Sequence, residues 1–144
     1  MDGYLNVDIR ESCNPDIVCD VERLPFKEGS VDEIQAIDVF EHISFRKSKE
    51  VLKHWIGLLK SDGVIYIQSP SITRIMEYLI QAKSLFELET VISLLYGNQD
   101  YEQNYHKTVC DPHLLAHYLR EIGVTGEISY SMVNTNMILK AYKS

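Results

Sequence analysis

The sequence lacks the features that mark several classes of protein. No apolar run is long enough to span a bilayer, and no basic segment followed by an apolar one opens the chain, so we expect neither a membrane protein nor a secreted one. It also has no excess of basic residues: the formal net charge is -7, which argues against general binding to nucleic acid. Only three cysteines occur, Cys13, Cys19 and Cys110, and their spacing is not that of a zinc site. We therefore expect free thiols and a cytoplasmic protein.

The composition that remains is typical of one folded domain. A chain of 144 residues is long enough for a hydrophobic core and too short for two comfortable domains. A hydrophobic content of 45% with 24% charged residues argues against disorder. Because the sequence contains no repeat, low-complexity tract or internal linker, residues 1–144 are predicted to form a single domain.

Hydrophobic periodicity predicts strands that alternate with helices in the first half. Short apolar or β-branched runs bounded by turn residues predict strands, and a one-sided apolar pattern over 46–60 predicts a helix that Gly63 ends. Strand, helix and strand in this order predict a right-handed parallel crossover. The predicted strands of this half are residues 4–9, 16–20, 31–40 and 64–70.

The second half has a different pattern. Residues 73–96 are apolar at helical spacing and predict one broken helix or two consecutive ones. Asp111 and Pro112 are typical of a helix start, and that helix is expected to end at Gly123. Two β-type runs around Asn134 predict an antiparallel hairpin. The fold class predicted is therefore α/β, with a mostly parallel sheet and a terminal antiparallel hairpin.

Four spaced motifs make the prediction more specific: GYLNVDI, CDVERLPFKEGSVDEIQAIDVFEHI, LLKSDGVIYIQSP and LYGNQDYEQNYHKTVCDPHLLAHYLREIG. In this order they cover nearly the whole chain and resemble class I S-adenosylmethionine-dependent methyltransferases of the type 11 family. The resemblance implies a Rossmann-like methyltransferase sheet that is truncated at the N-terminus, because the family's first strand and glycine-rich loop precede the first motif. A second departure is Ser61-Asp62-Gly63 in place of the usual Pro-Gly-Gly turn.

The resemblance also implies a cofactor, S-adenosylmethionine, and the residues that would hold it at the carboxyl ends of the strands. Asp8 would accept hydrogen bonds from the ribose hydroxyls. Asp20 would face the adenine amino group, Val21 would donate its backbone N–H, and Leu24 would pack on the ring. Asp38 would lie beneath the sulfonium. For Asp8 and Asp20 the alternative is a local role in a turn.

Two histidines are candidates for the base that a hydroxylated methyl acceptor needs. His42 and His106 both suit this role, with Glu41 as the carboxylate that orients them. For His42 the alternative is a helix-start residue packed beneath its neighbours, and a structural role stays open for His106 too. His113 and His117 have the i, i+4 spacing of metal ligands, but a third ligand at suitable spacing is missing, so we expect no metal site.

Three functional hypotheses follow. The first is an S-adenosylmethionine-dependent methyltransferase acting on a sugar or another small hydroxylated acceptor. The second is a degenerate, non-catalytic protein of the same fold that acts as a binding or assembly partner. The third keeps a nucleotide-like ligand pocket between Asp8 and Asp20 without methyl transfer. Because a missing central strand would leave a gap of roughly 10 Å in the sheet, we also expect a homo-oligomer or a partner protein that covers this region.

Overall fold

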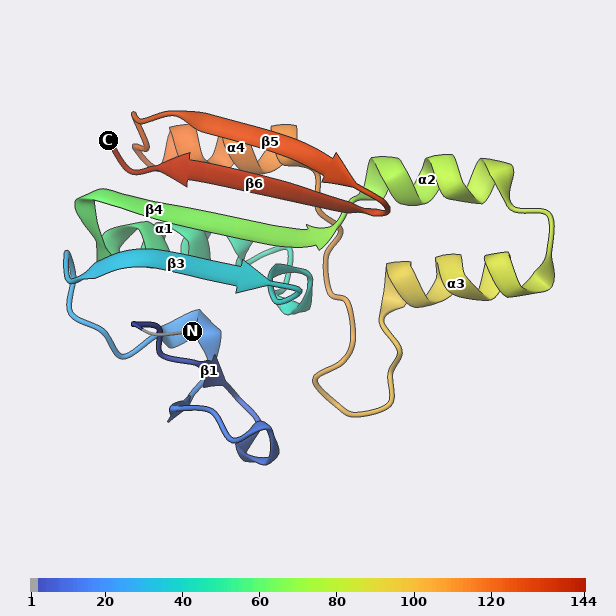
Figure 1. Ribbon diagram of the computed structural model, residues 1–144, viewed down its shortest axis with the longest axis horizontal. Coiled ribbons are helices and arrows are strands. Elements are labelled where there is room, and N and C mark those ends of the chain that lie inside the picture. The colour runs from blue at the N-terminus through green and yellow to red at the C-terminus, as the bar shows by residue number, and fades with distance from the viewer. Residues whose placement is uncertain (1–2) are drawn as a thin grey trace.

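The computed structural model of the chain describes residues 3–144 and divides their six strands between two sheets (Figure 1). A small sheet holds two short parallel strands, and a larger sheet has the order β3-β4-β6-β5. In the larger sheet β3 and β4 are parallel, whereas β6 runs antiparallel to both β4 and β5. These parallel pairs and the terminal hairpin confirm the predicted α/β fold class. The strands are β1 (Val7–Asp8), β2 (Ile17–Val18), β3 (Val31–Ile37), β4 (Leu59–Pro70), β5 (Ile128–Val133) and β6 (Asn136–Tyr142).

The helices lie where the pattern predicts them, but the expected end of the first one at Gly63 is wrong: α1 ends at Leu58 with an extended residue after it, and Gly63 lies within β4. The stretch over 73–96 forms two helices because a capping box starts the second one: the Ser84 hydroxyl accepts from the N–H of Glu87, and the Glu87 carboxylate accepts from the N–H of Ser84. The helices are α1 (Ser48–Leu58), α2 (Ile72–Gln81), α3 (Leu85–Tyr96) and α4 (Pro112–Glu121), with short 3-10 turns η1 (Glu11–Cys13), η2 (Val21–Arg23) and η3 (Phe40–His42).

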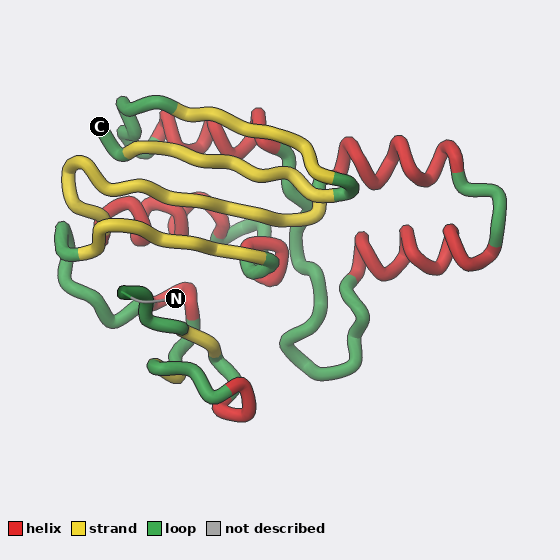
Figure 2. Tube along the Cα trace, viewed as in Figure 1, coloured by secondary structure: helices red, strands yellow, loops and turns green. Residues whose placement is uncertain are grey.

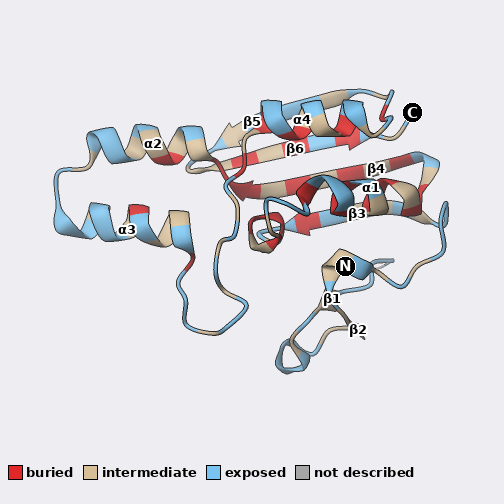
Figure 3. Ribbon diagram, turned by 180° about the vertical axis from the view of Figure 1, so that it is seen from behind, coloured by how far each residue is buried: buried red, intermediate tan, exposed pale blue. Residues whose placement is uncertain are grey.

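The core lies between the larger sheet and helices α1 and α4, which cover one of its faces (Figure 3). Trp55 of α1 is 1% exposed and packs edge-on against Phe40, with ring centroids 6.0 Å apart. Its indole N–H donates to the carbonyl of Val21 at 2.8 Å. This bond ties η2, next to the predicted cofactor residues, to the core helix.

Strands β1 and β2 lie apart from the larger sheet, and β1 is the nearer of the two to β3 (Figure 3). Within residues 3–144 no backbone hydrogen bond joins β1 to β3. A side-chain bond crosses between these segments, from Gln35 Nε2 to the Tyr4 hydroxyl at 3.1 Å. Strands β1 and β3 are therefore not paired directly, and their facing edges have no strand partner in the described part of the chain.

Helices α2 and α3 form a hairpin that extends away from the sheet (Figure 2). Its apolar side chains are largely exposed, among them Ile80, Leu85 and Phe86 at 84%, 80% and 75%. The loop after α3 returns toward the carboxyl ends of β3 and β4 (Figure 1). Among the described residues, no helix is long and apolar enough to cross a membrane.

Candidate functional site

Two acidic residues stand at the same edge of the small sheet. Asp8 ends β1 and pairs in parallel register with Val18, so Asp20, which follows β2, lies at the same carboxyl edge. Asp8 Oδ1 accepts from the N–H of Arg10 at 2.7 Å and lies 3.5 Å from its Nε. Burial alone would raise the pKa of Asp8, but the N–H and guanidinium of Arg10 outweigh it and hold the pKa below its ordinary value. Asp8 is thus an ionised acceptor at the predicted place.

Both aspartates also have the local role that the sequence left open. Asp20 Oδ1 accepts from the N–H of Glu22 at 2.9 Å and so caps η2, as Asp8 caps the turn at Arg10. A carboxylate has about four acceptor positions, so these bonds leave each group able to accept from a ligand. The cofactor role of the two aspartates stays a prediction that this geometry permits.

The other predicted cofactor residues are Val21, Leu24 and Asp38. The first two contact the core, whereas Asp38 is exposed. Val21 uses its carbonyl to hold Trp55, and Leu24 packs on the edge of the core. Asp38 directly follows β3, has a left-handed backbone with φ 52°, and is exposed. Its carboxylate oxygens lie 3.4 and 3.5 Å from Gln68 Nε2 of the next strand, a weak contact that leaves the group available.

The structure brings the three predicted catalytic residues together. Glu41 and His42 lie in η3, just after β3, and His106 comes from the loop between α3 and α4. One side-chain oxygen or nitrogen of each lies within 4.8 Å of those of the other two. The two imidazole rings meet edge to face, with centroids 5.0 Å apart. We refer to Glu41, His42 and His106 as the Glu-His-His cluster.

Backbone hydrogen bonds explain how a residue so far along the chain reaches η3. The carbonyl of Glu41 accepts from the N–H groups of Lys107 and Thr108 at 2.8 and 3.1 Å. Farther on, Cys110 forms a parallel bridge with Ser71 at the end of β4. The loop is therefore fixed at two points across the carboxyl ends of β3 and β4.

Gly97 gives the same loop its direction. Its backbone has φ 76° and ψ 168°, a region that is essentially restricted to glycine. A Cβ atom there would lie 2.1 Å from the carbonyl oxygen of Asn104, which no backbone tolerates. Glycine thus allows segment 104–106 to approach the end of α3, where the His106 N–H donates to the carbonyl of Tyr96 at 3.1 Å.

The hydrogen bonds of the two histidines define their chemistry. Nδ1 of His42 lies 3.0 Å from the carbonyl oxygen of Tyr105, and Nδ1 of His106 lies 2.9 Å from that of Leu94. A carbonyl can only accept, so each Nδ1 carries the proton. In the neutral rings each Nε2 then has a free lone pair, which can take a proton or bind a cation.

Glu41 is a buried acid, with 2% of its surface exposed. Burial raises its pKa to about 7, against the opposing effects of its own backbone N–H, of the Ser69 hydroxyl and of His106. The Ser69 hydroxyl donates to Glu41 Oε2 at 2.9 Å. The neighbouring thiol of Cys110 is a different case, since burial raises its pKa to about 12 and makes it unreactive.

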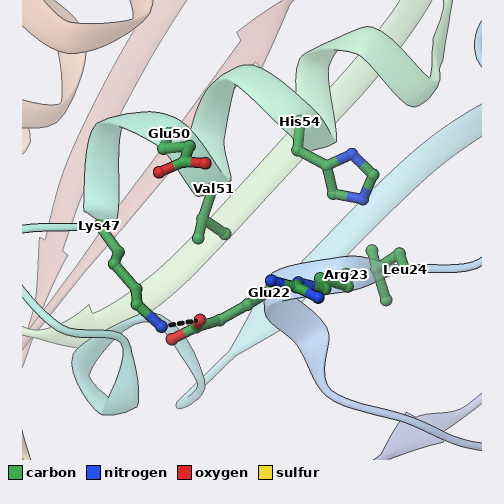
Figure 4. A pocket seen from close by; sticks show the side chains of 7 residues that line it. All are labelled: Glu22, Arg23, Leu24, Lys47, Glu50, Val51 and His54. Carbon is green, nitrogen blue, oxygen red and sulfur yellow. Dashed lines mark hydrogen bonds and ion pairs between the residues drawn. The ribbon is translucent and has the colours of Figure 1, made fainter.

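A cleft of about 430 Å³ lies elsewhere, between η2 and α1 (Figure 4). An ion pair between Lys47 Nζ and Glu22, 2.6 Å long, runs along it, and His54 lies on its α1 side (Figure 4). Leu24 is the only predicted site residue among those that line it. The cleft therefore does not contain the Glu-His-His cluster, and we assign it no role in the chemistry.

The remaining histidine pair stays on the surface of α4. His113 stacks edge-on against Tyr130, and its Nε2 lies 3.3 Å from the tyrosine hydroxyl. His117 faces Glu121, with 3.6 Å between Nε2 and the carboxylate. Sequence reasoning named every member of the Glu-His-His cluster but did not anticipate that they form a possible ligand set, because spacing along the chain carries no signal for that contact.

Comparisons with known proteins agree with the fold. A family model described as a methyltransferase domain matches residues 5–67. An S-adenosylmethionine-dependent methyltransferase from Archaeoglobus fulgidus has a similar structure, with a TM-score of 0.63 and 14% identity over 94% of this chain and 74% of that one. PH0226 from Pyrococcus horikoshii gives a TM-score of 0.60 and 18% identity over 97% and 74%. No curated protein matches the sequence.

Other similar structures are much longer than this chain. An O-methyltransferase family protein from Burkholderia thailandensis gives a TM-score of 0.55 and 19% identity, with 81% of this chain covered but 31% of that one. These similarities show a Rossmann-like fold of the kind found in methyltransferases. Residues 5–67 thus match a methyltransferase family model, and the chain as a whole is similar in fold to solved S-adenosylmethionine-dependent methyltransferases. The family match agrees with the resemblance seen in the motifs over residues 5–67.

Proposed function

We propose that the chain acts in the transfer of a methyl group from S-adenosylmethionine to a sugar or another small hydroxylated acceptor. The observation that carries this proposal is the Glu-His-His cluster at the carboxyl ends of β3 and β4, beside Asp38. In this type of fold ligands bind outside the carboxyl ends of the strands. A set of proton-accepting groups at that place suits an acceptor that must lose a proton.

The chemistry asked of the chain's own residues is limited. The bound cofactor would supply an activated methyl group, so the protein must align the acceptor and remove its proton. His106 would take that proton at Nε2 while its Nδ1–H stays on the carbonyl of Leu94. The imidazolium formed in this way would lie beside Glu41, whose carboxylate stabilises the positive charge.

The described residues fit one end of the cofactor better than the other. Asp8 and Asp20 offer carboxylates on adjacent parallel strands for the ribose and the adenine. The charged methionine end would lie between β1 and β3, where no backbone of residues 3–144 pairs with the facing edge of either strand. Backbone at this place would give the charged methionine end about two hydrogen bonds, worth about 1.5–3 kcal/mol each. Without them, cofactor binding is weaker by roughly a hundred- to ten-thousand-fold. We therefore expect residues 3–144 alone to bind the cofactor in the millimolar range.

Saturation-transfer NMR with S-adenosylhomocysteine tests the proposal, because it detects millimolar binding. We expect a signal for the unaltered protein and a loss of about 1.5–3 kcal/mol of binding free energy in Asp8→Ala. The matched control is Asp32→Ala, which removes an exposed carboxylate paired with Lys60 on the far end of the sheet. No signal for the unaltered protein, or equal binding by Asp8→Ala and Asp32→Ala, would count against the cofactor role.

One observation favours a second function, assembly with another polypeptide. The facing edges of β1 and β3 have no strand partner within the described residues, and no described helix covers the second face of the larger sheet. Soluble proteins avoid open strand edges. We infer that a second copy or a partner protein covers this region. Light scattering at low micromolar concentration tests this, and a monodisperse monomer with protected β3 amides would contradict it.

If assembly were the whole function, the chain would be a non-catalytic partner with the methyltransferase fold. Such a protein would associate in the scattering experiment and give no saturation-transfer signal with S-adenosylhomocysteine. The two measurements together therefore separate the enzyme from the assembly partner.

A further inference from the structure

The Glu-His-His cluster offers the ligand types of a transition-metal site. Two imidazole nitrogens and one carboxylate oxygen form a common zinc ligand set, with the ion held about 2.0–2.2 Å from each. Ligand atoms around such an ion lie about 3.4 Å apart in tetrahedral geometry. In the structure the corresponding atoms lie within 4.8 Å of one another. A modest contraction of side chains would thus close the site.

The hydrogen-bond partners of the cluster are of the kind that orient metal ligands in proteins. Histidines that bind a metal nearly always donate their other ring N–H to a carbonyl or carboxylate. Both histidines do so, His42 to Tyr105 and His106 to Leu94. Glu41 in turn accepts from the hydroxyl of Ser69. The two histidines are therefore oriented through Nδ1, which leaves Nε2 of each ring without a competing partner among the described residues, and Glu41 is oriented through Oε2.

The buried carboxylate of Glu41 would be stabilised by a bound cation. A carboxylate as buried as that of Glu41 is costly unless it is paired. In the described part of the chain no lysine or arginine forms an ion pair with it, and the nearby Asp38 adds further negative charge. The carbonyl bonds keep both histidines able to present Nε2 as a neutral ligand. A divalent cation would satisfy the carboxylate and both lone pairs at once.

We propose that Glu41, His42 and His106 bind a divalent transition-metal ion, with Zn²⁺ as the best match to their chemistry. This replaces the expectation of no metal site, which rested on the surface pair His113 and His117. Three protein ligands leave a coordination position open. If the proposed methyl transfer is correct, the ion would take the place of His106 as the activating group: an acceptor hydroxyl at the open position would have a lowered pKa and would lose its proton to water, because the Nε2 lone pair of His106 would be bound to the metal.

Calorimetric titration of the metal-stripped full chain with Zn²⁺ alone tests the site. We expect one equivalent to bind, and we expect Glu41→Gln, His42→Gln and His106→Gln each to lower the affinity by at least tenfold. His117→Gln is the matched control, because it removes an exposed histidine that lies outside the cluster and should leave affinity unchanged. Absence of binding, or a loss in His117→Gln with none in His106→Gln, would overturn the proposal.

A second measurement keeps the test decisive if a variant fails to fold. Co²⁺ added to the unaltered protein should give a visible absorption band and paramagnetic shifts of the ring protons of His42 and His106. Shifts confined to His113 and His117 would assign the metal to the surface of α4 and refute the site. Neither measurement needs S-adenosylmethionine, so failure of the proposed methyl transfer would leave these results intact, and the reverse holds as well.

Discussion

Gly97→Ala is the substitution that most severely tests how the loop presents His106. Alanine at φ 76° and ψ 168° costs about 1–3 kcal/mol in backbone strain. Its Cβ would also lie 2.1 Å from the carbonyl oxygen of Asn104, so segment 104–106 must move. That movement breaks the bonds from His106 to the carbonyls of Tyr96 and Leu94, now 3.1 and 2.9 Å long.

The magnitude follows from these parts. Two lost hydrogen bonds at about 0.5–1.5 kcal/mol each add about 1–3 kcal/mol to the strain. The free energy of unfolding should therefore fall by about 2–6 kcal/mol, less if the loop finds new partners. Urea unfolding followed by circular dichroism measures this loss. The same variant should lose Zn²⁺ affinity, because His106 no longer reaches Glu41 and His42.

Two other glycines provide matched controls. Gly123 has φ 99° but open space around its Cβ position, so Gly123→Ala should show strain without a clash. Gly57 lies inside α1 with nothing within 4 Å of a Cβ, so Gly57→Ala should stabilise by about 0.5–1 kcal/mol. Neither should change Zn²⁺ affinity. If Gly97→Ala unfolds like the unaltered protein and keeps the His106 ring resonances in place, the reasoning is refuted.

Three further predictions concern separate parts of the fold. Ser84→Ala removes the capping box of α3 and should lower the free energy of unfolding by about 1 kcal/mol. An unchanged urea midpoint would show that the α2–α3 hairpin does not unfold cooperatively with the rest of the chain. Trp55→Phe loses the indole hydrogen bond to Val21 and should lower the free energy of unfolding by at least about 0.5–1.5 kcal/mol. Hydrogen exchange should increase first in η2, and an equal increase in all elements would argue against the bond linking η2 to α1. With a thiol reagent at pH 8, exposed Cys13 should react at once and buried Cys110 after unfolding, and early labelling of Cys110 would contradict its raised pKa.

The elements that sequence predicted well are those with local signals. Asp111 and Pro112 predicted the start of α4, and the Asp111 carboxylate does accept from the first N–H groups of that helix. Asn134 predicted the β5–β6 turn, where it adopts a left-handed backbone with φ 55°. In each case the information lies within a few residues, where side chain and backbone interact directly.

Two features depended on longer-range structure. The runs over 4–9 and 16–20 were expected as strands, but β1 and β2 are two residues long because each pairs with the other alone among the described residues. The position of His106 depends on two bonds to the carbonyl of Glu41 and on the space that Gly97 leaves. Neither effect leaves a pattern in the sequence, since contacts between distant segments are decided by the path of the loop.

The proposal that the strand ends form a cofactor site is tested most directly by mapping amide chemical shifts during titration with S-adenosylhomocysteine. We predict that the largest changes fall on the segments that follow β1, β2 and β3, at Asp8, Asp20 and Asp38 and their neighbours. Changes confined to the cleft between η2 and α1, or no change at millimolar ligand, would contradict the proposed site.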